Sequence, residues 1–106
     1  MNILIRADSS SYIGTGHIMR DLVLAKQYKN ENIIFATQNL VGNINHKIEE
    51  ENYKIELLKS NGFEELNKLV KKFEIDMIVI DSYDIDYNFE KKLKEDNSSL
   101  KIFVLD

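Results

Sequence analysis

The fold is decided by residues 2–25, which read NILIRADSSSYIGTGHIMRDLVLA. An apolar run at the start of this stretch predicts a β-strand over residues 2–7. A loop with two glycines, Gly14 and Gly16, follows, and apolar side chains then recur at helical spacing over residues 18–28. A strand that runs through a glycine-rich loop into a helix is typical of α/β proteins in which the loop approaches a phosphate group.

The rest of the chain repeats this alternation of strands and helices. Further strands are predicted over residues 32–37, 53–58, 76–81 and 101–105, and further helices over residues 41–51, 63–73 and 87–95. The run DMIVID at residues 76–81 is almost entirely apolar between its acids, as expected of a strand that is covered on both faces. The order βαβαβαβαβ predicts one α/β domain: a five-stranded parallel, Rossmann-like sheet in a three-layer sandwich.

Length and composition limit the possible functions. A chain of 106 residues suffices for one domain, and its net charge of -4 argues against binding to nucleic acid or to an anionic membrane surface. The absence of cysteine excludes a disulfide framework and a thiolate metal site, and His17 and His46 lack the spacing of metal ligands. No apolar run reaches the roughly 20 residues of a membrane helix, and the first residues do not resemble a signal peptide. We therefore expect a cytoplasmic protein.

The glycine loop carries an incomplete dinucleotide-binding fingerprint. Met19 stands where GxGxxG requires its third glycine, and residues 36–39, which read ATQN, supply no acid for a ribose. The chain also lacks a Walker loop and a Gly-x-Ser-x-Gly elbow. A phosphorylation receiver would need an aspartate after the third strand, where residues 58–60 read LKS. These observations disfavour NAD binding, P-loop chemistry, serine hydrolysis and a receiver function.

His17 is the main candidate catalytic residue, because it lies at the predicted start of a helix directly after Gly16. The positive end of the helix dipole disfavours an imidazolium and tends to keep the ring neutral. A neutral imidazole can accept a proton, as a general base must. Asp21 lies four residues later on the same helical face and is a candidate to orient the ring. The alternative is an ordinary surface histidine near a helix end.

Other polar residues near these loops have two possible roles each. Arg6 and Asp8 flank the end of the first predicted strand and form either a local ion pair or a loop cap. Arg20 either reaches an anionic ligand or lies on the solvated side of its helix. Asp81 and Tyr83 follow the buried strand, at the same predicted sheet edge as the glycine loop. They either face a substrate or belong to a loop that caps the next helix.

Residues 6–25 follow the pattern R-x-D-S-S-x-x-I-G-x-G-H-x-x-R-D-L-x-L-A. This pattern resembles the opening of the UDP-2,4-diacetamido-2,4,6-trideoxy-β-L-altropyranose hydrolases of pseudaminic acid biosynthesis and of their spore-coat polysaccharide relatives. The match is specific around residues 13–20 and extends more loosely along the whole chain, including I-D-x-Y at residues 80–83. The family is similar in fold to GT-B glycosyltransferases, in which two Rossmann-like domains face a cleft.

The resemblance implies hydrolysis of a UDP-sugar at its anomeric carbon, which releases UDP and the free sugar with inversion. No bound cofactor and no metal are expected. The chain would form the N-terminal domain, residues 1–106, and a second domain or partner chain would complete the cleft and hold most of the nucleotide. On this view His17 is the base that activates water. The residues expected near the sugar or the phosphates are Gly14, Thr15, Gly16, Arg20 and Tyr83.

Two other functions remain open at this point. The chain is alternatively half of a GT-B glycosyltransferase, in which His17 activates the hydroxyl group of an acceptor. It is alternatively a non-catalytic module that binds a sugar nucleotide or a protein. A strict need for an acceptor in UDP release would indicate the transferase, and binding without turnover would indicate the module.

Overall fold

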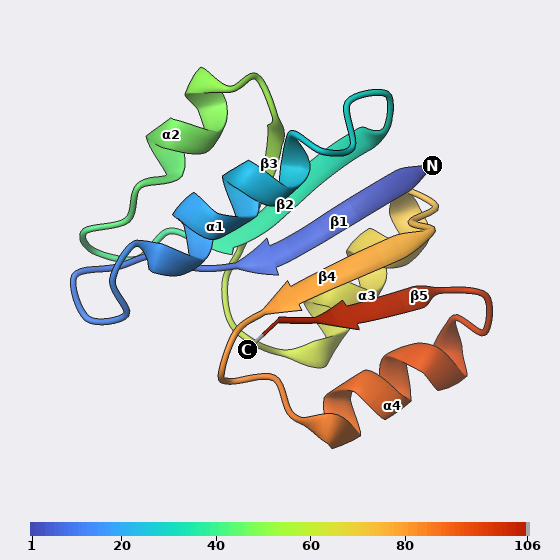
Figure 1. Cartoon of the computed structure of the whole chain (residues 1–106). Coiled ribbons are helices and arrows are strands. Elements are labelled where there is room, and N and C mark those ends of the chain that lie inside the picture. The colour runs from blue at the N-terminus through green and yellow to red at the C-terminus, as the bar shows by residue number, and fades with distance from the viewer. Residues whose placement is uncertain (106) are drawn as a thin grey trace.

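The computed structural model describes residues 1–105, in which strands and helices alternate along the chain (Figure 1). The strands and helices predicted from the sequence are all present in the predicted order. The strands are β1 (Asn2–Ala7), β2 (Asn32–Gln38), β3 (Lys54–Leu58), β4 (Met77–Asp81) and β5 (Lys101–Val104). The helices are α1 (Gly16–Ala25), α2 (Asn45–Glu50), α3 (Phe63–Lys72) and α4 (Tyr87–Asp96).

The strands form one parallel sheet in the order β3-β2-β1-β4-β5. β1 lies at the centre, where Ile3 pairs with Ile33 of β2 on one side and with Met77 of β4 on the other. The strand order reverses between β1 and β4, so that the loops leaving these two strands diverge at the carboxyl edge. The predicted five-stranded, Rossmann-like parallel fold is confirmed, and this switch point is where such folds bind ligands.

Helices cover both faces of the sheet, which gives the predicted three-layer sandwich. Successive side chains of β1 point to opposite faces of the sheet, so Ile3 and Ile5 belong to one apolar cluster and Leu4 to the other. The first cluster is closed by α1, through Ile18 and Leu22, and by α2. The second is closed by α3 and α4. β4 is buried along its whole length, as its apolar run predicts.

The largest differences from the predicted helix boundaries concern α1, which also ends three residues early at Ala25, and α2. α1 begins at Gly16, two residues before the predicted start, so His17 lies inside its first turn. The helix predicted over residues 41–51 is shorter and begins only at Asn45. Gly42 has a φ of 80°, in the left-handed region that a helix cannot use, and the side chain of Asn43 accepts a hydrogen bond from the backbone N–H of Asn45 at 2.9 Å. Among residues 1–105, no helix is long and apolar enough to cross a membrane.

Candidate functional site

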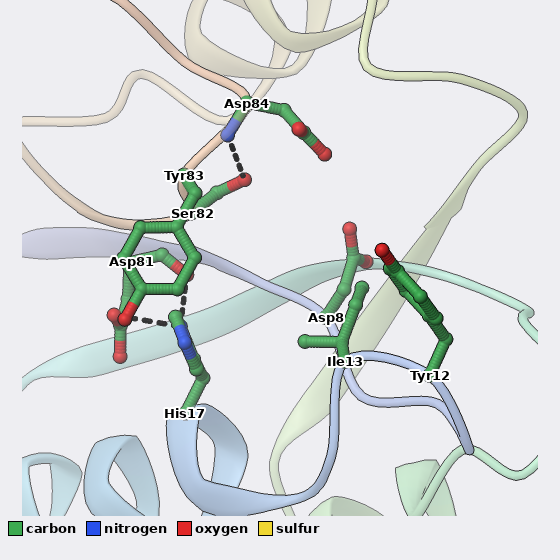
Figure 2. A pocket seen from close by; sticks show the side chains of 8 residues that line it. All are labelled: Asp8, Tyr12, Ile13, His17, Asp81, Ser82, Tyr83 and Asp84. Carbon is green, nitrogen blue, oxygen red and sulfur yellow. Dashed lines mark hydrogen bonds and ion pairs between the residues drawn. The ribbon is translucent and has the colours of Figure 1, made fainter.

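A pocket of about 610 Å³ opens at the switch point, between the loop that follows β1 and the loop that follows β4 (Figure 2). It brings together residues that are far apart in the sequence but lie at the same edge of the sheet. Of the residues predicted to form a site, the pocket includes His17 and Tyr83, whereas Arg20 and the backbone of residues 14–16 lie outside its lining. The lining residues are Asp8, Tyr12, Ile13, His17, Asp81, Ser82, Tyr83 and Asp84.

The glycine loop is a tight turn that satisfies its own polar groups. The backbone N–H of Gly14 donates to the carbonyl of Ser10 at 2.8 Å, and Ser10 donates in return to Gly14 at 3.2 Å. The hydroxyl of Ser10 accepts from the backbone N–H groups of Tyr12 and Ile13, at 3.1 and 2.7 Å. Gly14 closes the turn with a φ of 90°, a conformation that glycine adopts without strain. The turn therefore presents Tyr12 and Ile13 at the pocket wall.

The loop between β2 and α2 supports this turn from outside the pocket. Ser11 donates from both its backbone N–H and its hydroxyl to the carbonyl of Val41, at 2.9 and 3.0 Å. The hydroxyl of Ser9 accepts from the backbone N–H of Ile44 at 2.8 Å. Serines of this run thus anchor one loop to another, which is a structural role.

His17 is held by two oxygen atoms of one residue. Its Nδ1 lies 2.9 Å from the backbone carbonyl oxygen of Asp81 and 2.9 Å from the carboxylate Oδ1 of Asp81. Both oxygens are acceptors, so Nδ1 must carry the hydrogen, and in the neutral ring Nε2 then has a free lone pair. The side chain is 13% exposed, and the ring of Tyr83 packs edge-on against it with centroids 5.1 Å apart. This is the tautomer and setting that a general base requires.

Asp81, at the end of β4, binds a second cation from the same helix. Its carboxylate is buried and accepts hydrogen bonds from Nε of Arg20 at 3.3 Å and from the terminal guanidinium nitrogen of Arg20. This hydrogen bond to Asp81 raises the pKa of Arg20 above its usual value. Asp81 does not cap α4, since that role belongs to Asp86, which accepts from the backbone N–H of Phe89 at 3.0 Å. Asp81 therefore does not cap the next helix, and its buried carboxylate binds His17 and Arg20.

Asp21 is not the residue that orients His17, although its spacing on α1 suggested it. It is completely buried, and neither carboxylate oxygen accepts a hydrogen bond from any donor among residues 1–105. Burial first, and then the nearby charge of Asp81, raise the pKa of Asp21 to about 8. A buried carboxyl group with a pKa raised in this way favours its protonated form at neutral pH.

Arg6 forms a buried ion pair with Asp8, which lines the pocket, with Nη2 and Oδ2 at 2.9 Å. The two residues form the local ion pair that one of the two sequence interpretations predicts, and the pair also connects neighbouring strands. Asp8 accepts from the backbone N–H and the side chain of Gln38, at 2.7 and 3.0 Å, and Arg6 donates to Asn61. Burial raises the pKa of Asp8, but the hydrogen bonds from Arg6 and Gln38 outweigh it and hold that pKa below its usual value.

The contact between His17 and Asp81 was not predicted from the sequence. Neither were the hydrogen bonds that Gln38 makes with Asp8 and that Asn61 makes with Arg6. The signal for Asp81 was its position directly after the buried strand, together with the central places of β1 and β4 in a sheet of this order. Gln38 and Asn61 carry no local signal, because their partners come from other strands and loops. Within residues 1–105, no three His, Asp or Glu side chains converge in the way that would hold a metal ion.

The chain is similar in sequence to known proteins. The chain is 42% identical over all 106 residues to the curated UDP-2,4-diacetamido-2,4,6-trideoxy-beta-L-altropyranose hydrolase of Campylobacter jejuni, and it spans 36% of that protein's length. It is 33% identical over 98 residues to an uncharacterized protein of Methanocaldococcus jannaschii, spanning 20% of its length. No protein-family model matches the chain. The resemblance inferred from residues 6–25 is thereby confirmed, and it extends over the whole chain.

Proposed function

We propose that the chain is the N-terminal, Rossmann-like domain of a GT-B-type hydrolase of a UDP-diacetamido-trideoxy sugar. Water attacks the anomeric carbon, the bond from that carbon to the diphosphate oxygen breaks, and His17 takes the proton of the water on Nε2. The products are UDP and the free sugar. The observation that carries this proposal is the fixing of Nδ1 of His17 by Asp81 at the rim of a pocket, which leaves Nε2 as the base.

The pocket suits a sugar better than a phosphate. None of its eight lining residues is a lysine or an arginine, and three of them are aspartates. Carboxylates such as those of Asp8 and Asp84 accept hydrogen bonds from sugar hydroxyl groups and from acetamido N–H groups. The ring of Tyr83, which is 82% exposed and packs against His17, offers an apolar surface to a sugar ring at the same place. The water that His17 activates would thus lie beside the sugar.

The diphosphate would lie at the start of α1. Thr15 precedes this helix and makes no side-chain hydrogen bond to its first turn, so the turn's N–H groups and the positive end of the helix dipole are available to an anion. A Cβ atom added at Gly14 or at Gly16 would meet nothing within 4 Å, so a ligand can approach this backbone closely. These features support the predicted role of residues 14–16 in binding phosphate oxygens.

The rest of the nucleotide would be held by protein that lies outside these 106 residues. The chain spans 36% of the length of the Campylobacter hydrolase, whose name describes the activity of the whole protein. In a GT-B arrangement, a second Rossmann-like domain or a partner chain would face the carboxyl edge of the sheet and close the pocket over the substrate. The activity is therefore proposed for the completed protein.

The test is UDP release by the complete product of the reading frame and by two matched variants. His17→Asn removes the base and should lower kcat by about 10²- to 10⁴-fold, the range of a general base. His46→Asn is the control, because His46 is exposed on α2 and should leave kcat within about twofold, a shift of less than 0.5 kcal/mol. Equal rates for His17→Asn and the unmodified protein would refute the role of His17. Release only with an added acceptor would indicate a transferase, and binding without turnover a sugar-nucleotide module.

A further inference from the structure

Asp21 is a buried acid without a donor. It lies in α1 four residues after His17, its side chain is inaccessible to solvent, and both carboxylate oxygens lack an N–H or O–H partner among residues 1–105. An ionised carboxylate in this position would lose its hydration and gain no hydrogen bond in return. A neutral carboxylic acid avoids this cost and also has a hydrogen to donate.

The acceptor for that hydrogen is the buried carboxylate of Asp81, because Asp81 binds His17 and Arg20, which precede Asp21 on α1 by one turn and by one residue. A hydrogen bond with Asp81 also contributes to the raised pKa of Asp21. Asp81 already accepts from His17 and from Arg20, so it is stabilised as the anion of the pair. Arg20, from α1, and Asp81, from β4, are the charged groups that act on Asp21. Two carboxyl groups in direct contact share one proton, and the group without cationic partners keeps it. By this argument Asp21 is the acid and Asp81 the anion.

We propose that Asp21 is a positioning residue, a neutral carboxylic acid that donates its O–H to Asp81 and so holds the carboxylate of Asp81 against Nδ1 of His17. The hydrogen-bond chain runs from Asp21 through Asp81 to His17, and its outer end is Nε2 at the pocket. Its value for catalysis rests on the proposed role of His17 as the base. The arrangement of the three side chains does not depend on that role and can be tested without substrate.

Two substitutions separate positioning from simple packing. Asp21→Asn keeps the size of the side chain and a donor, because its amide N–H₂ can replace the carboxylic O–H toward Asp81. Asp21→Leu keeps an approximate volume and removes the donor. A residue that only fills space would tolerate both changes in the same way, whereas a positioning residue requires the donor. Glu64→Gln, on the exposed face of α3, is the control for loss of one carboxyl group.

The experiment is NMR spectroscopy of the chain and these variants, without any ligand. The carboxyl carbon of Asp21 should titrate near pH 8, and this inflection should vanish in Asp21→Asn while Nδ1 of the neutral His17 ring remains the protonated nitrogen. In Asp21→Leu the His17 nitrogen shifts should move toward a mixture of the two tautomers. Titration of Asp21 below pH 5, or unchanged His17 signals in Asp21→Leu, would overturn the proposal. If Asp21→Leu does not fold, the titration of the unmodified chain and of Asp21→Asn decides the matter.

A failure of the proposed hydrolase function would appear in the UDP-release assay and leave these spectra unchanged. The reverse holds as well, since a normal rate loss in His17→Asn combined with an ordinary titration of Asp21 would refute only the positioning role. The two proposals are thus tested by different measurements on different variants.

Discussion

Nδ1 of His17 lies 2.9 Å from both the backbone carbonyl and the carboxylate of Asp81, although 64 residues separate the two along the chain. The strand order creates this contact. β1 and β4 are neighbours in the sheet, so the helix that follows β1 and the last residue of β4 meet at one edge. The general base of the proposed reaction therefore comes from α1, the helix that follows β1, and the group that sets its tautomer comes from the end of β4. Each can be replaced separately.

Asp81→Asn should abolish most of the proposed activity while the protein stays folded. The asparagine keeps the volume but loses the charge that faces His17 and Arg20, and its amide can donate toward Nδ1, which favours the wrong tautomer. We expect kcat to fall by about 10²- to 10⁴-fold, as it does when a buried carboxylate partner of a catalytic histidine is made neutral. Asp86→Asn is the control, because asparagine caps a helix as well as aspartate does. Similar kcat values for the two variants would contradict the role of Asp81.

Arg20→Gln separates the two roles considered for this arginine. The side chain of Arg20 is 44% exposed and pairs with Asp81, so the loss of the pair should cost no more than about 1 kcal/mol, or roughly fivefold in kcat. KM should then change little. A rise in KM of more than tenfold at constant kcat would instead show that Arg20 binds an anionic group of the substrate. Steady-state kinetics at two salt concentrations would distinguish these outcomes.

Asp21 should make the stability of the chain depend on pH. Its pKa is raised to about 8 in the folded state, so between about pH 4 and pH 8 the folded chain holds a proton that the unfolded chain has released. Stability is then highest at the acidic end and falls as the pH rises, by up to about 1.4 kcal/mol per pH unit. Asp8 acts in the opposite direction, but its lowered pKa confines its effect to the range below about pH 4.

Urea unfolding at a series of pH values between 5.5 and 8.5 measures this dependence. The difference between the unmodified chain and Asp21→Asn should grow in favour of the variant as the pH rises, because the asparagine has no proton to lose. Taking the difference cancels the titration of the histidines, which both proteins share. Glu64→Gln should run parallel to the unmodified chain. A constant difference across the range would refute a neutral Asp21.

The fold followed from the sequence because its signals are local. Apolar runs mark the strands, helical spacing marks α1 and α3, and one alternating order of elements permits few parallel sheets. The helix boundaries that were predicted wrongly depend on contacts with other segments of the chain. α2 begins late because Gly42 and Asn43 form a turn, and that turn is held by serines of the β1–α1 loop.

Only part of the site could be predicted from the sequence. His17 is marked by its place after Gly16, and Tyr83 by its place after a buried strand. The spacing of four residues pointed to Asp21 as the partner of His17, because local spacing describes one helix and ignores the rest of the sheet. Asp81 takes that place, since the switch point brings β4 to α1. Tertiary packing buries Asp21, and the residues next to it in the sequence do not indicate this burial.

Arg6→Met should be among the most destabilising single substitutions in the chain. Arg6 is 1% exposed and pairs with Asp8, so its removal leaves a buried carboxylate whose remaining donors come from Gln38. Breaking a buried pair in this way costs about 3–5 kcal/mol. Replacing both partners in Arg6→Met/Asp8→Leu should recover part of that loss, because no charge is left buried. Denaturant unfolding measures both, and a double variant less stable than Arg6→Met would contradict this account.

Gly14→Ala and Gly42→Ala should differ in cost although both glycines have positive φ, 90° and 80°. At Gly14 an added Cβ meets nothing within 4 Å, so only the backbone conformation is penalised, by about 1 kcal/mol. At Gly42 the Cβ would lie 2.6 Å from the backbone nitrogen of Ser11, an atom that cannot move without shifting the turn that carries Tyr12 and Ile13. We expect at least about 2 kcal/mol there, since overpacking adds to the backbone cost. Denaturant unfolding compares the two variants, and equal costs would show that the β2–α2 loop does not brace the pocket wall.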